Sequence, residues 1–174
     1  MGFDVYGKNP VLVEGSEEPK FPENYGKLSH EEQSAHWKKV NEYQSQNPGT
    51  YFRASVWSWR PLWDIMSKTC EHLLSPEMLN DMCVNDGAGP DDQDTCSAMA
   101  DCIKEFLEES DWLKAKEYTL GSDLRVSKSG IFLKPEELED EKVWQESRSA
   151  YGIEISHILE WCRFLKQCGG FQVC

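Results

Sequence analysis

Two segments of the chain place apolar residues at the three- and four-residue intervals that are typical of one face of an α-helix. The first segment runs through Leu62, Ile65, Met66, Thr69, Cys70 and Leu73. The second runs through Ile155, Ile158, Leu159, Cys162 and Leu165. We predict a core-facing helix in each, the second one spanning residues 153–166. Two glycines at 169–170 follow it, as is typical of a helix C-cap.

Three further helices are indicated by their first residues. Ser29 and Glu32 have the spacing of a capping box, which predicts a helix over residues 29–44. This helix has few apolar positions, so we expect it to lie on the surface. The Ser-Pro pair at 75–76 predicts a short helix, because serine caps a helix and proline is tolerated in its first turn. An aspartate-rich start predicts another helix within residues 91–107, since acidic side chains are favoured at a helix N-terminus.

Three short segments read as strands, because aromatic and β-branched residues dominate them. They are Phe3–Tyr6, Tyr51–Trp57 and Phe171–Cys174. Each needs a partner for its backbone groups, so we predict that the three form one small mixed or antiparallel sheet. The central strand leads directly into a helix, with Ser58 as its N-cap and Pro61 in its first turn.

These elements predict an α+β fold that is predominantly helical and forms a single globular domain over residues 1–174. Long loops are expected at 15–28 and 111–134. Within the less regular part, residues 124–126 and 131–133 favour a hairpin or an ordered loop. Residues 135–145 favour an acidic helix with few apolar contacts.

The net charge and the spacing of the cysteines argue against several classes of function. The chain of 174 residues has a net charge of −13, which argues against binding to nucleic-acid backbones, since that needs clustered Lys and Arg. No apolar run has the length of a membrane span and no secretion signal begins the chain, so we expect a cytoplasmic protein. None of its seven cysteines has CxxC spacing, which favours reduced thiols and predicts neither a metal nor a cofactor.

The predicted junction between strand and helix gathers the most distinctive side chains. Arg53, Trp57, Trp59 and Arg60 lie within eight residues of one another. The arginines could hold a phosphate or carboxylate while a tryptophan stacks on a base. Alternatively, the tryptophans fill the core and the arginines pair with some of the many carboxylates.

A glycine-containing turn is the second candidate. Its residues Asn85 and Asp86 precede two glycines, which would let a backbone approach a ligand closely, and Asp86 could accept a hydrogen bond from a ribose or a base. The turn matches neither a dinucleotide fingerprint, a P-loop nor an EF-hand. The aspartates at 86–94 are compatible with a weak divalent-cation site. The alternative is that the segment is a tight turn whose aspartates cap the next helix. The four histidines show no zinc or nucleophile signature.

The chain resembles a family of uncharacterised proteins that is common in bacteriophages and their bacterial hosts. The features that carry this resemblance occur in the same order along nearly the whole chain: MGFDVYG, YFR followed by WSWRPLW, NDGAGPD and FLKQCGGFQVC. Many members of that family carry CxxC pairs, read as a zinc module, before the last helix. Residues 112–149 of this chain hold no cysteine and so depart from that pattern. The resemblance implies a phage-like cytosolic origin and no established activity.

Three functional hypotheses follow. The first is a non-enzymatic protein that binds a small anionic, nucleotide-like ligand, with Arg53, Trp57, Trp59, Arg60, Asn85 and Asp86 lining the pocket. By analogy with small phage proteins, it could sequester a host defence signal. The second is an acidic interaction or inhibitor module that acts on a host protein. The third is a metal-dependent nucleotide hydrolase that uses the aspartates.

Overall fold

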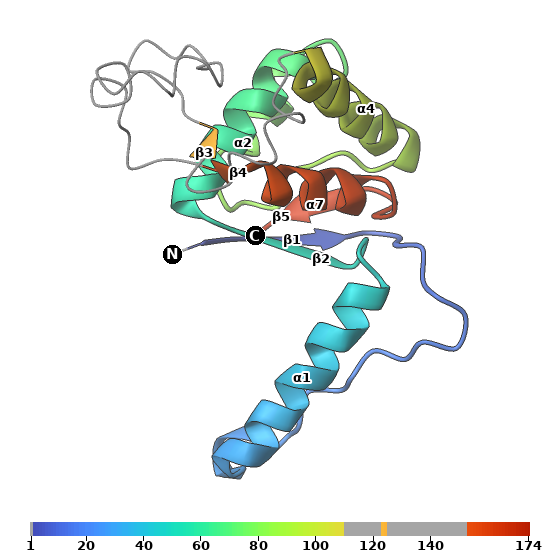
Figure 1. Cartoon of the computed structure of the whole chain (residues 1–174), viewed down its shortest axis with the longest axis vertical. Helices are drawn as coiled ribbons and strands as arrows, with labels where there is room; N and C mark the ends of the chain where they lie inside the picture. The colour runs from blue at the N-terminus through green and yellow to red at the C-terminus, as the bar shows by residue number, and fades with distance from the viewer. Residues whose placement is uncertain (1, 110–122, 125–152) are drawn as a thin grey trace.

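The computed structural model describes residues 2–109, 123–124 and 153–174. It is an α+β fold built on an antiparallel sheet of three strands (Figure 1). In that sheet β1, Gly2–Gly7, lies between β2, Tyr51–Ser55, and β5, Phe171–Val173. The predicted fold class and the three predicted strands are therefore confirmed.

Strand β1 is central because both neighbours pair with it. Val5 lies opposite Phe52 on β2 and opposite Val173 on β5. The register points alternate residues to opposite faces, as it must in a pleated sheet. The inner face carries the buried side chains of Phe3, Val5, Phe52, Ala54, Phe171 and Val173.

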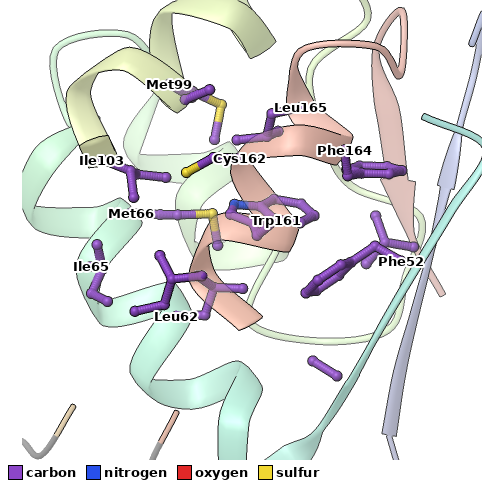
Figure 2. Close-up of a cluster of buried hydrophobic side chains, with 14 of the residues drawn as sticks. Phe52, Leu62, Ile65, Met66, Met99, Ile103, Trp161, Cys162, Phe164 and Leu165 are labelled. Carbon is purple, nitrogen blue, oxygen red and sulfur yellow. The ribbon is translucent and has the colours of Figure 1, made fainter. Parts of the chain in front are cut away.

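Helices α2, Val56–Thr69, and α7, Ile155–Leu165, lie on this inner face, and α4, Gln93–Glu109, packs on both of them. Their apolar faces meet in one core around Trp161, whose ring stacks on Phe164 at 5.2 Å and meets Trp59 edge-on at 5.7 Å (Figure 2). Helix α7 is shorter than predicted because Ile153–Glu154 form strand β4, which pairs with β3, Asp123–Leu124. Apart from Leu124, the predicted hairpin lies outside the described residues, as does the predicted acidic helix.

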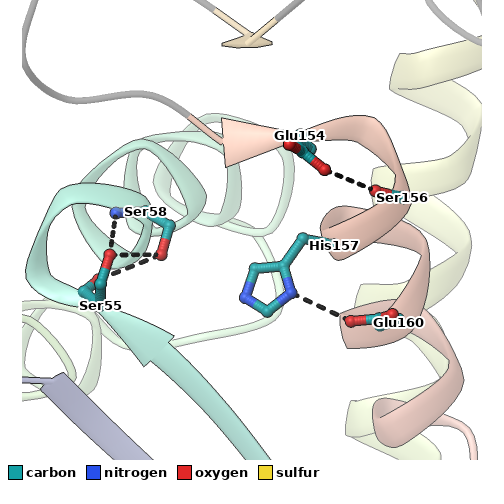
Figure 3. Close-up of polar contacts among 6 residues, drawn as sticks. All are labelled: Ser55, Ser58, Glu154, Ser156, His157 and Glu160. Atoms are coloured by element: carbon teal, nitrogen blue, oxygen red, sulfur yellow. Dashed lines mark hydrogen bonds and ion pairs between the residues drawn. The ribbon is translucent and has the colours of Figure 1, made fainter. Parts of the chain in front are cut away.

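The junction between β2 and α2 comes earlier than predicted. The strand ends at Ser55, and the Oγ atom of Ser55 caps the helix by accepting a hydrogen bond from the backbone N–H of Ser58 (Figure 3). Ser58 was expected to be the cap, and Pro61 was expected in the first turn. Since the helix begins at Val56, Pro61 instead lies in its second turn, where it cannot donate to the preceding turn. The earlier start places Trp57, which was expected in the strand, within the helix.

The segment between α2 and α4 returns the chain to the sheet. Helix α3, Pro76–Asp81, begins at the predicted Ser75 cap. The glycine turn then lies along the outer edge of β5. Gly87 donates its N–H to the carbonyl of Val173 at 2.7 Å, and Phe171 donates to the carbonyl of Pro90 at 2.9 Å. Residues 87–90 thereby close one edge of the sheet.

Helix α1, His30–Gln46, projects away from the rest of the fold, and no residue in it is buried. Figure 1 shows it on the side of the sheet opposite to α2, α4 and α7. The predicted capping box is present, because Ser29 and Glu32 bond to each other reciprocally. The preceding residues run beside the helix and include a 3₁₀ turn, η1, at Tyr25–Lys27.

Candidate interaction surface on the sheet

The outer face of the sheet carries polar side chains, which the inner face lacks, together with two tyrosines. Asp4 and Tyr6 of β1 stand beside Tyr51 and Arg53 of β2, and we call these four residues the outer sheet surface. The Tyr6 residue is 44% exposed and the Arg53 side chain is 66% exposed. Because α2 and α7 pack on the other face, this surface faces solvent in the described part of the chain.

Asp4 organises this surface. Its Oδ1 atom accepts a hydrogen bond from the Tyr51 hydroxyl and lies 3.8 Å from Nε of Arg53. The Tyr6 ring lies 5.3 Å from the Tyr51 ring, so the two aromatic rings are in contact. Partial burial, followed by the hydrogen bond to Asp4, raises the pKa of Tyr51 to about 12. The Tyr51 phenol is therefore a hydrogen-bond donor at neutral pH and not a base.

The outer edge of β2 is the second feature of this surface. The N–H of Gly7 donates to the carbonyl of Thr50, so residue 50 and every second residue after it point their backbone groups toward β1. Tyr51 and Arg53 therefore turn their N–H and C=O groups to the other side. No described strand lies along that side. An extended segment of another chain could add to the sheet there.

The predicted site residues of the junction divide between core and surface. Trp59 is completely buried and donates its indole N–H to the carbonyl of Met82 at 3.0 Å. It is a core residue and is not available for stacking on a ligand. Trp57 is 50% exposed, and Arg53 and Arg60 are exposed.

The structure brings the glycine turn beside this junction. The Nη1 atom of Arg60 lies 3.4 Å from Sγ of Cys83, and Asn85 donates its side-chain N–H to the carbonyl of Gly2 at 3.3 Å. Asn85 and Asp86 are both exposed. Of the six predicted residues, all but Trp59 thus lie on the surface.

The glycines of the turn have a structural role. Gly89 has φ +151°, and a Cβ atom there would come within 2.4 Å of the carbonyl oxygen of Phe171. The backbone of the turn is also hydrogen-bonded to β5, since the carbonyls of Ala88 and Pro90 accept from that strand. The close approach that glycine permits is an approach to β5.

The remaining titratable candidates, two aspartates and a histidine, make structural contacts. Asp91 forms an ion pair with Lys8, and Asp92 caps α4 by accepting from the N–H of Thr95 at 2.7 Å. His157 stacks on Phe52 at 4.8 Å and lies 3.0 Å from Glu160 (Figure 3). Within the described ranges, no group of His, Cys, Asp and Glu is arranged to hold a metal ion.

One thiol and imidazole do meet. The Sγ atom of Cys102 on α4 lies 3.8 Å from Nε2 of His72, which lies in the turn that follows α2. Desolvation, followed by the nearby carboxylates of Glu105 and Asp101, raises the pKa of the Cys102 thiol. A nucleophilic cysteine needs the opposite shift, because the thiolate is the reactive form.

Sequence reasoning missed Tyr6 and Tyr51. The alternation of the strands carried the signal, since Tyr51 and Arg53 are two residues apart and must share a face. Comparisons with family models, with curated proteins and with solved structures gave no match. In the described part of the chain, no helix is both long enough and apolar enough to cross a membrane.

Proposed function

We propose that this protein acts by binding another protein at the outer sheet surface, without catalysing a reaction. The observation that carries the proposal is the exposure of Tyr6 and Arg53 on a sheet face that no described helix covers. Tyrosine, tryptophan and arginine are enriched among the few residues that dominate the binding energy at protein interfaces. Trp57, two residues beyond the end of β2, is a third residue of this kind and is half-exposed.

The outer edge of β2, which no described strand covers, and the net charge indicate which kind of partner would bind. The edge accepts an extended segment, whose backbone would bond to Tyr51 and Arg53. A net charge of −13 attracts a partner with a basic surface and accelerates its approach. By the resemblance to phage proteins, we infer that this partner is a host protein of the bacterial cytosol.

Site-specific crosslinking tests the proposal. A photoreactive amino acid at position 57 should capture a protein from the bacterial cytosol, whereas the same group at the exposed Glu105 of α4 should not. With the captured protein purified, Arg53→Ala and Tyr6→Ala should each weaken binding by about tenfold or more. Their melting temperatures should stay close to that of the wild type. Equal capture at both positions, or binding that neither variant weakens, would overturn the proposal.

A second candidate function is the sequestration of a small anionic, nucleotide-like ligand, which would bind at the junction of β2 and α2. The contact of Arg60 with Cys83 and that of Asn85 with Gly2 favour it, because they keep the turn beside the junction. A panel of nucleotides should then include one that raises the melting temperature of the wild type but not that of Arg60→Ala. Intact ligand recovered after heat release would indicate sequestration, and a cleaved product would indicate hydrolysis.

A further inference from the structure

Residues 8–46, which lead to and include the projecting helix α1, hold most of the exposed large hydrophobic side chains in the described structure. We call this segment the arm. Five of the eight large hydrophobic side chains that are exposed in the described structure belong to it: Val11, Leu12, Val13, Phe21 and Trp37. A helix gains most of its stability from burying one face, and α1 buries no residue.

One side of α1 is covered by the arm itself. Gln33 donates to the carbonyl of Leu28 at 3.0 Å, and the indole N–H of Trp37 donates to the Tyr25 hydroxyl at 2.7 Å. The Phe21 and Tyr25 rings pack against each other at 4.8 Å. These contacts hold the preceding loop along the helix.

Another side of α1 is an open, nearly flat surface that no other described part of the chain covers. We call it the open face of α1. Its lining residues are Ser34, Trp37, Lys38, Asn41, Glu42, Ser45 and Gln46. Ser34, Asn41 and Ser45 are short side chains, so another helix can approach closely. Lys38 and Glu42 are one turn apart, and within the described structure neither has an ion-pair partner.

We propose that the open face of α1 binds the same face of a second copy of this chain, with the two helices antiparallel. A two-fold axis level with residue 40 then sets Lys38 of each copy against Glu42 of the other. The ion pair forms twice, because the interface uses the same patch on both copies. The Trp37 ring of each copy packs beside Asn41 of the other, on the opposite side of the helix pair from the two ion pairs.

Charge selects this arrangement over others. A parallel pair would set Lys38 against Lys38 and Glu42 against Glu42, and like charges repel at that distance. The antiparallel pair converts both repulsions into attractions.

Reversing the charges singly and together tests the register. The full-length wild-type chain should sediment as a dimer at concentrations of about 10–100 μM, the range of a weak homodimer. Lys38→Glu and Glu42→Lys should each raise the dimer dissociation constant by about tenfold or more, since each turns two ion pairs into two repulsions. The double variant should restore the wild-type constant, because the two pairs re-form with their charges exchanged.

Lys39→Glu is the matched control. It makes the same charge change one residue away, where the side chain lines the groove toward residues 15–20 instead of the open face. Its dimer should match that of the wild type. A monomeric wild type, a dimer unaffected by both single reversals, or a double variant that stays monomeric would each overturn the inference. The proposed function rests on the sheet and would survive any of these outcomes.

Discussion

The indole N–H of Trp59 lies 3.0 Å from the carbonyl oxygen of Met82, and both residues are completely buried. This hydrogen bond joins the start of α2 to the end of α3. It also fixes where the chain leaves α3 for the glycine turn. The residue that seemed suited to stack on a ligand thus positions the segment that closes the sheet.

Replacing Trp59 with Phe should destabilise the protein by about 1–3 kcal/mol, because the Met82 carbonyl would lose its partner inside the core. Urea unfolding followed by circular dichroism measures the change. Trp57→Phe is the control. Because Trp57 is 50% exposed, this substitution should reduce the free energy of unfolding by less. Equal costs would show that Trp57 is as structural as Trp59.

The Gly89→Ala substitution should destabilise the protein more than the Gly87→Ala substitution does. Both glycines have positive φ, so alanine at either position costs about 1–2 kcal/mol of backbone strain. At Gly89 the new methyl group would also collide with the Phe171 carbonyl, whereas nothing lies within 4 Å of that position at Gly87. Thermal unfolding of the two variants under one condition gives the comparison. A Gly87 variant that is the less stable of the two would contradict this packing.

Asn47→Ala should loosen the arm. Asn47 is the one buried polar residue in the described part of the chain; its Oδ1 accepts from the N–H of Val13 at 2.7 Å, and its Nδ2 donates to the carbonyl of Tyr43 at 3.0 Å. Removing the amide leaves the Val13 N–H without its acceptor, at a cost of about 1–3 kcal/mol, whereas the Tyr43 carbonyl keeps the backbone N–H of residue 47. Amide hydrogen exchange at Val13 should accelerate. Asn80→Ala, on the exposed side of α3, should leave that exchange rate unchanged.

Ile158→Ala should cost about 2–5 kcal/mol as a truncation in the core. Leu159→Ala should cost less, because Leu159 is only half-buried whereas Ile158 is completely buried. Urea midpoints at a common slope give both values. A larger loss for Leu159 would mean that the buried face of α7 is rotated from the one described.

The free energy of unfolding should fall as the pH rises above about 9. Desolvation raises the pKa of Cys70 to about 11 and that of Cys162 to about 12, from an ordinary value of 9.0. Above that value the unfolded chain releases these protons while the folded chain keeps them, so the linkage favours unfolding. Urea titrations at a series of pH values measure the slope, and Cys70→Ala should flatten it. A slope identical in the variant would show that other groups cause the loss.

The sequence predicted the elements better than it predicted the site. Capping residues located α1 and α3, because a serine cap depends only on its neighbours in the chain. The junction at Ser55 was displaced by three residues, since two nearby serines, Ser55 and Ser58, could both cap. The buried face of α7 includes Trp161 and Phe164 because the sheet supplies Phe52 and Phe171 beneath them, which helical spacing alone does not reveal.

The site depends on contacts between distant parts of the chain. Trp57 and Trp59 are the same residue type two positions apart, and the Met82 carbonyl draws only one of them into the core. The outer sheet surface needs the pairing of β1 with β2, which sets Asp4 opposite Arg53. Alternation along a single strand gives the face of each residue but not its neighbour on the next strand.

The two edges of the sheet are unequal, and this limits how the molecule can polymerise. Growth of a fibre by strand addition requires every subunit to offer two open edges, one for the subunit before it and one for the subunit after it. In the described structure residues 87–90 already occupy the β5 side, which leaves β2 as the open one. Association through the sheet therefore ends after a single addition, so the exposed β2 edge can serve recognition without propagating into an aggregate.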